Sequence, residues 1–283
     1  MKTRSALAAA TCIAALASLG SAHAVEVITS ASGANAAAIL AAVTGFRNDL
    51  GTLNPNTAGS VGSGRREINW DGVPDALSAP NNMPANFFNV NSPRGAVFAT
   101  PGSGFQVSAN AGVAPVEFGN LNAVFPSLFT TFSAQRLFTA LGSNVLDVNF
   151  FVPGSTTAAT TSAFGAVFTD VDAANTTSLQ FFDTANVSLG TFFVAAAAGD
   201  ETLSFLGVRF NAGEQIGRVR ITSGNGALTS PISDLGDAVA MDDFIYAEPL
   251  AIAAIPEPAN VVMLGVGLGL LGWRLRLRGQ RIG

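Results

Sequence analysis

Hydrophobic residues near the start of the chain recur with the period of a helix. The recurring positions are Ile39, Leu40, Val43, Phe46 and Leu50. Apolar residues three and four positions apart share one helix face. Asn35 is suited to cap the first turn, and Gly51 is suited to end the last. The pattern predicts one short N-terminal amphipathic helix over about residues 35–50.

After this helix the pattern becomes that of a β protein. Residues 51–66 are rich in Asn, Gly, Ser and Pro and are predicted to form a loop. From about Glu67 onwards, short runs of Val, Phe, Ile and Thr are separated by turn residues, as in successive strands. We expect strands at 96–98, 105–107, 145–152, 164–169, 178–182, 191–194, 203–210, 217–222 and 238–246.

Two further features of this pattern favour a sandwich of antiparallel sheets. In the run 217–222, Val219 and Ile221 alternate with Arg218, Arg220 and Thr222, which predicts one buried and one polar strand face. No helical segment recurs between the strands, so a parallel sheet is disfavoured. We therefore expect one mainly β domain, a jelly-roll-like antiparallel β-sandwich, with the 21 phenylalanines packed in its core.

The two ends of the chain are apolar and differ from the rest. Residues 1–24 have a basic start, an Ala/Leu-rich middle and a final Ala-His-Ala, which predicts a signal peptide helix cleaved between Ala24 and Val25. Residues 259–273 are almost entirely apolar, and the Arg-rich end 274–283 follows, which predicts a transmembrane helix. At ~1.5 Å per residue this helix is shorter than a ~30 Å hydrocarbon core, so a transient anchor suits it best.

The residues between these ends exclude several kinds of chemistry. Residues 25–255 contain eight Arg and 18 Asp and Glu, and no Lys, His or Cys. Without those three residue types the domain cannot build a Ser/His/Asp or Cys/His triad, a lysine Schiff base, or a His or Cys zinc site. Its negative charge disfavours binding to nucleic acid. We expect a protein that is not an enzyme and has no cofactor, calcium excepted.

The C-terminal segment resembles a known sorting signal. Pro256, Glu257 and Pro258 are followed by the apolar run and then by the basic residues. In this order the three parts are similar to the PEP-CTERM tail of proteins from Gram-negative bacteria, here residues 256–283. The resemblance implies Sec export, processing at the inner membrane by an exosortase, and a link to extracellular polysaccharide. It implies nothing direct about residues 25–255.

Acidic residues are the remaining candidates for chemistry, and the first group lies in the polar stretch 65–75. Glu67, Asp71 and Asp75 could be a surface turn held by Arg–carboxylate pairs, ligands of a calcium ion, or the acid and base of a glycosidase. The spacing of these residues alone leaves all three interpretations open.

Two more acidic groups follow expected strands. Asp170 and Asp172 would point the same way at a strand end, a start for a hard cation such as calcium. Asp242 and Asp243 lie inside an apolar strand. If Asp243 shares a face with Met241 and Ile245, its carboxylate points at the core and needs a partner, which could be an Arg or a calcium ion. The calcium candidates are Asp71, Asp75, Asp170, Asp172, Asp242 and Asp243.

Two functions are consistent with these observations. The first is an exported, C-terminally sorted surface or matrix protein with a non-catalytic β-sandwich associated with exopolysaccharide. The alternative is a calcium-assisted carbohydrate-binding module or a carboxylate-dependent glycosidase. Exposed Trp or Tyr side chains usually stack on sugars, and the domain has only Trp70 and Tyr246, which favours the first function.

Overall fold

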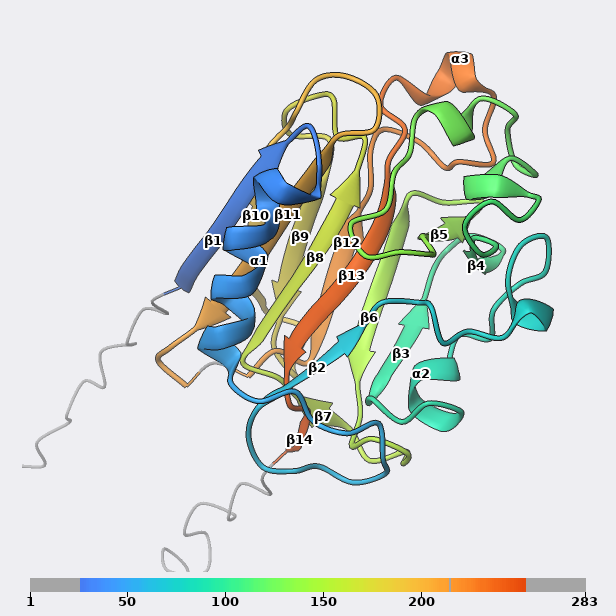
Figure 1. The fold of residues 1–283 in the computed structure, drawn as a ribbon. Coiled ribbons are helices and arrows are strands. Elements are labelled where there is room, and N and C mark those ends of the chain that lie inside the picture. Colours follow the sequence, from blue (N-terminus) through green and yellow to red (C-terminus); the bar gives the residue numbers. More distant parts are fainter. Residues whose placement is uncertain (1–25, 214, 253–283) are drawn as a thin grey trace, which may run out of the picture.

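Two antiparallel sheets face each other across a shared core (Figure 1). The structure is a computed structural model that describes residues 26–213 and 215–252. One sheet, here called the helix-covered sheet, has the order β1-β11-β8-β13-β5-β4, and β2 also pairs with β13. Its strands are β1 (Glu26–Gly33), β2 (Arg65–Ile68), β4 (Gly104–Val107), β5 (Phe138–Leu141), β8 (Ala163–Thr169), β11 (Leu203–Phe210) and β13 (Ala240–Ala247).

The opposite sheet has five strands in the order β10-β9-β12-β6-β3. They are β3 (Ala96–Ala99), β6 (Val145–Phe150), β9 (Ser178–Phe182), β10 (Ser188–Phe193) and β12 (Arg218–Thr222). A two-stranded ribbon joins β7 (Ala159–Thr160) to β14 (Leu250–Ala251). Every ladder between described strands is antiparallel, so the predicted mainly β, antiparallel class is confirmed.

The core between the sheets follows the alternation of the sequence. Along β12, Val219 and Ile221 are buried and their neighbours are partly exposed, as predicted. Trp70 lies in the same core with its ring stacked on Phe138 at 4.0 Å between centroids. Sixteen of the 21 phenylalanines are buried, but they divide between this core, a cluster under α1 and a cluster under the loops of residues 118–129, so the sandwich core alone does not hold them.

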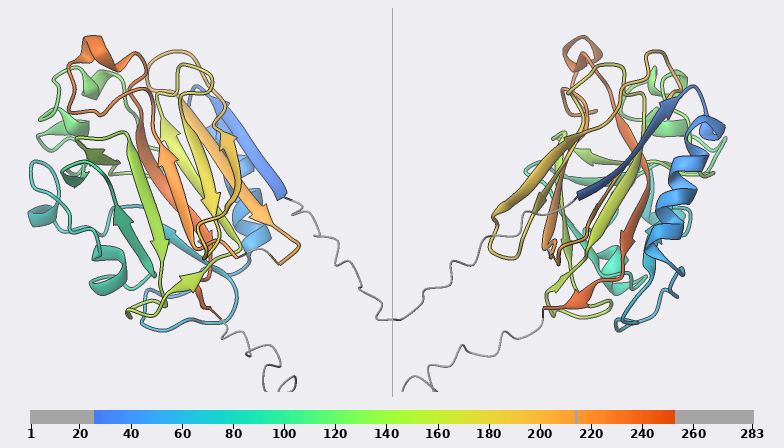
Figure 2. Two further views of the ribbon diagram at one scale, coloured as in Figure 1. Left: turned by 180° about the vertical axis from the view of Figure 1, so that it is seen from behind. Right: turned by 90° about the vertical axis from the view of Figure 1, so that its left-hand side faces the viewer.

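The predicted amphipathic helix is confirmed as α1 (Ala36–Leu50), which covers the outer face of one sheet (Figure 2). The Asn35 side chain accepts a hydrogen bond from the Ala38 N–H, and Gly51 ends the helix at a φ of 89°. Phe46 packs over the cross-strand pair Gly165 and Gly207, where a Cβ on Gly207 would lie 2.7 Å from the ring. Leu40 was expected on the apolar face of this helix, and this was wrong, because the residue is 50% exposed.

Some elements carry too little local pattern to be predicted. Strand β1 lies at a sheet edge and leaves Ile28 52% exposed, so its burial does not alternate cleanly. Strand β5 has four residues, all buried, and a short apolar run does not distinguish strand from helix. Strand β2 begins at Arg65, inside the expected loop. The remaining short elements are α2 (Phe87–Val90), α3 (Ile232–Leu235) and three 3₁₀ turns (Asp75–Leu77, Val116–Phe118 and Phe125–Ser127).

The predicted sorting segments lie outside the described residues. These are the signal peptide of residues 1–24 with its cleavage site, and the tail of residues 256–283 with its transmembrane helix. No helix within residues 26–213 and 215–252 has the length and apolar character needed to cross a bilayer.

Candidate functional site

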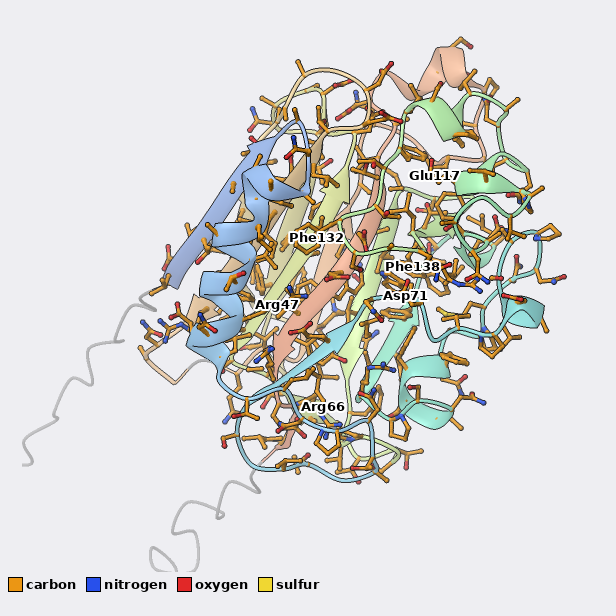
Figure 3. The ribbon with its side chains drawn as sticks, in the orientation of Figure 1. Arg47, Arg66, Asp71, Glu117, Phe132 and Phe138 are labelled. Carbon is orange, nitrogen blue, oxygen red and sulfur yellow. The ribbon has the colours of Figure 1, made fainter. Side chains whose placement is uncertain are left out.

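A polar cluster lies where α1, β2 and β13 meet on the helix-covered sheet. Arg47, from the last turn of α1, donates two hydrogen bonds to the Glu67 carboxylate at 3.0 and 2.9 Å. Its Nη2 also donates to Asp243 Oδ2 at 2.8 Å. Figure 3 labels Arg47 beside α1. Arg65 Nε donates to the same Glu67 at 2.6 Å. Glu67 of the first acidic group is therefore held by arginines, as one of the three interpretations predicted.

A β-bulge in β13 changes the strand faces that Asp242 and Asp243 occupy, relative to those that simple alternation of side chains predicts. The register between β13 and β8 shifts between Met241 and Phe244. A bulge adds a residue to one strand and changes which face the next side chains occupy. Met241 then lies in the core between the sheets, whereas Ile245 packs in the cluster under α1. The condition that Met241, Asp243 and Ile245 share a face is therefore not met, and the partner of Asp243 is Arg47, one of the two partners considered.

Asp242 is held by the segment of residues 131–136, which runs beside the bulge. Its Oδ2 accepts from the backbone N–H of Phe132 at 2.6 Å and of Ser133 at 3.2 Å. The Ser133 hydroxyl donates to Asp243 Oδ1 at 2.6 Å. Burial and the adjacent Asp243 raise the pKa of Asp242 well above its usual range, and burial also raises the pKa of Asp243. The pair thus retains a proton at a pH where an exposed carboxyl has lost it.

The same segment binds the acids of residues 71–75. Asp71 Oδ1 accepts from the Gln135 N–H at 2.5 Å, and Asp75 Oδ1 accepts from Arg136 Nη2 at 2.5 Å. Trp70 Nε1 donates to the Asp242 carbonyl at 2.9 Å, which links β2 to the bulge. Four of the six calcium candidates therefore form hydrogen bonds with one segment, residues 131–136. Nothing in the sequence pattern indicated that residues 133, 135 and 136 would bind them.

Asp170 and Asp172 lie in a second, separate acidic group. Asp172 Oδ1 accepts from the Gly199 N–H at 2.8 Å, and the Asp172 N–H donates to Asp237 Oδ1 at 3.0 Å. Asp170 is buried, and its Oδ1 has no hydrogen-bond partner within the described part of the chain. Burial and the carboxylates of Asp172, Asp200 and Asp237 raise the pKa of Asp170 to about 8. The sequence pattern did not identify Asp200 or Asp237 as neighbours.

The six calcium candidates do not come together in one place. Within the described ranges, no group of three or more His, Cys, Asp and Glu side chains is arranged to hold a metal ion. No hydrogen bond or ion pair between described residues joins Asp170 or Asp172 to the other four candidates. The six acids divide between two places, so a single calcium site that contains them all is not formed.

Within residues 26–213 and 215–252, the aromatic side chains with polar edges, Trp70 and Tyr246, are both buried. Trp70 and Tyr246 have no exposed surface, and the Tyr246 hydroxyl donates to the Arg94 carbonyl at 3.0 Å. Neither ring offers a face on which a sugar could stack.

A small polar cavity opens beside the Arg47 cluster. Its volume is about 200 Å³, and its walls come from α1, β2, β13 and four loops. The lining residues are Arg47, Leu53, Asn54, Asn56, Glu67, Asn69, Arg94, Ser133 and Asp243. A mixture of guanidinium, carboxylate, amide and hydroxyl groups suits a ligand with several hydrogen-bonding groups.

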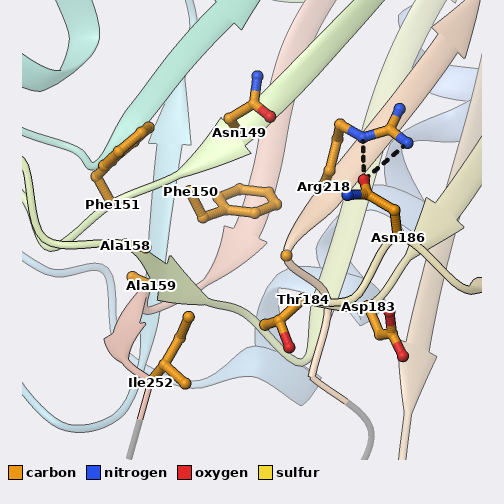
Figure 4. Close-up of a pocket in the computed structure, with 11 residues that line it drawn as sticks. Asn149, Phe150, Phe151, Ala158, Ala159, Asp183, Thr184, Asn186, Arg218 and Ile252 are labelled. Carbon is orange, nitrogen blue, oxygen red and sulfur yellow. Dashed lines mark hydrogen bonds between the residues drawn. The ribbon is translucent and has the colours of Figure 1, made fainter.

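Another cavity of about 200 Å³ lies beside the five-stranded sheet (Figure 4). It is lined by ends of β6, β7 and β12 and by the β9–β10 turn. Arg218 donates to the Asn186 side chain at 3.4 and 3.3 Å and to Asp147 at 2.9 Å, so its charge is already compensated. This cavity therefore presents fewer unused polar groups than the one beside Arg47.

No protein-family model, curated protein or solved structure matches this chain.

Proposed function

We propose that this protein is an exported, C-terminally sorted surface or matrix protein whose jelly-roll-like β-sandwich is non-catalytic and is associated with exopolysaccharide. The observation that carries the proposal is the Arg47 bridge, in which one guanidinium holds both Glu67 and Asp243. A glycosidase needs one carboxylate free to attack or to activate water and a second free to donate a proton. Glu67 is bound by two arginines, and Asp71 accepts from a backbone N–H, so both act as structural ties.

The ends of the sequence supply the location. A signal peptide at residues 1–24 sends the domain across the inner membrane through the Sec machinery. The tail at 256–283 would then be recognised by an exosortase through Pro256, Glu257 and Pro258. After processing, the domain is placed in the envelope or the extracellular matrix. A domain without Cys needs no oxidative pairing in that compartment.

Two tags test this location in an exosortase-containing Gram-negative host. One tag is inserted in the loop of residues 55–62, and the other follows Gly283. We expect the loop tag in surface or matrix fractions without the C-terminal tag. A triple alanine variant of Pro256, Glu257 and Pro258 serves as the control and should keep its tail in the membrane fraction. Uncut protein in the surface fraction, or protein retained in the cytosol, would contradict the proposal.

A calcium-assisted carbohydrate-binding module is the second candidate. One observation favours it, namely the buried Asp170 carboxyl with an unpartnered oxygen among Asp172, Asp200 and Asp237. Calcium prefers oxygen ligands of this kind. The effect of calcium on the melting temperature of the protein separates this candidate from the first.

A further inference from the structure

Arg94 differs from every other arginine in the described part of the chain because it has no ion pair. Seven arginines there contact an Asp or Glu carboxylate: Arg47, Arg65, Arg66, Arg136, Arg209, Arg218 and Arg220. Residues 25–255 carry more than two acids for each arginine, so a carboxylate partner was readily available. The missing partner of Arg94 therefore calls for a physical explanation.

The surroundings of Arg94 leave its charge largely uncompensated. Its Nη1 donates to the Ser92 hydroxyl, and its guanidinium lies 5.0 Å from the centroid of the Phe88 ring. Its Nε–H is buried without a hydrogen-bond partner. Burial lowers the pKa of Arg94, and the positive charge of Arg66 lowers it further. An arginine remains protonated in spite of such shifts, so a cation is held here without an anion beside it.

Arg94 lines the cavity beside the Arg47 cluster, where other groups can also bind a ligand. Asn56 is exposed, and its side-chain amide makes no hydrogen bond to the described residues. Asn69 donates to Asp71, which leaves its amide oxygen as an acceptor. Glu67 and Asp243 also line the cavity with carboxylate oxygens, and Arg47 is bound to both. The cavity thus offers one unpaired cation together with donors and acceptors for hydroxyl groups.

We propose that this cavity binds a single uronate residue of an acidic polysaccharide, with Arg94 holding the sugar carboxylate. The planar guanidinium matches a carboxylate in a two-bond geometry. The carboxylate oxygens of Glu67 and Asp243, which line the cavity, can accept hydrogen bonds from ring hydroxyls. About 200 Å³ is less than the roughly 300–1,000 Å³ of clefts for drug-sized ligands, so one ring fits and a longer stretch does not. The proposal rests on the proposed function only for the source of the ligand.

Calorimetry on the full chain in detergent tests the site directly. Sodium glucuronate should bind at least tenfold more tightly than glucose and than inorganic phosphate. Arg94→Gln should lower the glucuronate affinity at least tenfold, and Arg94→Lys should lower it less. Arg209→Gln is the matched control, because it removes the same charge from a partly exposed site outside this cavity and should leave the affinity unchanged.

Several results would overturn the proposal. They are the absence of glucuronate binding, equal binding of phosphate, or equal losses in the Arg94 and Arg209 variants. If Arg94→Gln does not fold, Asn56→Ala replaces it, because the exposed Asn56 side chain makes no hydrogen bond that supports the fold. A glucuronate affinity unchanged by Asn56→Ala would then contradict the site. Surface location with no glucuronate binding would refute the site and leave the proposed function intact. Glucuronate binding by a protein found only in the cytosol would refute the proposed function and leave the site intact.

Discussion

Arg47 and Asp243 are separated by 196 positions in the sequence and are joined by an ion pair of 2.8 Å. The Asp243 side chain is almost fully buried, whereas Arg47 is partly exposed. The pair connects α1 to β13, a strand in the interior of the helix-covered sheet. It also brings Glu67 of β2 to the same guanidinium. One side chain therefore fastens the helix to two strands.

Removal of Arg47 should destabilise the fold by leaving Asp243 without its cation. Loss of one partner from a fully buried pair costs about 3–5 kcal/mol, and the partial exposure of Arg47 reduces this to about 2 kcal/mol or more. Urea unfolding of Arg47→Met measures the loss. The matched control is Arg209→Met, whose 3.8 Å pair with Asp49 is partly exposed and should contribute less than ~1 kcal/mol. Equal losses in the two variants would contradict the role assigned to Arg47.

A glycine under α1 and a glycine on its exposed face should respond oppositely to alanine. In Gly207→Ala the new Cβ would meet the Phe46 ring, and such overpacking costs about 1–3 kcal/mol. In Gly45→Ala the new Cβ meets nothing within 4 Å, and alanine favours the helix by ~1 kcal/mol. Thermal unfolding should thus show a lower melting temperature for the first variant and a higher one for the second. Combining Gly207→Ala with Phe46→Leu should recover part of the loss, and no recovery would mean that Phe46 is not the obstacle.

Stability should decrease between about pH 4 and pH 8 because of one buried and one half-buried carboxyl. The pKa of Asp170 is raised to about 8, and burial together with Glu201 raises the pKa of Glu117 to about 7. Unfolded, both groups lose their protons near pH 4, so the native state binds more protons within this interval. The contribution of these groups to stability is therefore complete below pH 4, falls as pH rises, and is lost above pH 8.

Asp170→Asn tests this pH dependence. The amide cannot ionise, so the variant should lose less stability between pH 5 and pH 8 than the original protein, by on the order of a few kcal/mol. Asp49→Asn, at an exposed position, should keep the original profile. Chemical unfolding at four pH values measures both. A parallel profile for Asp170→Asn and the original protein would show that Asp170 does not hold its proton.

Calcium should leave the melting temperature of the protein unchanged at millimolar concentration. The described acids form no group arranged to hold a metal ion, and a ligand stabilises only by binding the native state. Differential scanning fluorimetry with calcium, and with magnesium as the control cation, measures the shift. A calcium-specific rise that disappears in Asp170→Asn would instead support the calcium-assisted carbohydrate-binding module.

The sequence predicts elements whose pattern is local. Helix α1 and strand β12 have a clear period over at least five residues, and both form where expected. β1 and β5 were missed because an exposed edge and a four-residue buried run lack that period. Elements with a clear local period can therefore be predicted from the sequence, and elements without one cannot.

The site was predicted only in part for a different reason. Glu67, Asp71 and Asp242 were selected within local groups of acids, but their partners depend on tertiary contacts. Ser133 lies more than 100 positions from Asp242, and Arg94 has no motif around it. The bulge in β13 also puts side chains on the opposite strand face from the one that strict alternation predicts. Contacts between distant segments therefore determine the chemistry of this protein, and local pattern does not reveal them.

The position of β13 in its sheet also governs when the chain can fold. This strand pairs with β8, β5 and β2, although it is the last long strand in the described part of the sequence. Until residue 247 has been synthesised, those three strands lack their shared neighbour, and contacts of such long sequence separation form slowly. The nascent chain should therefore stay open until synthesis of the domain is nearly complete, a state in which a translocation channel can still thread it.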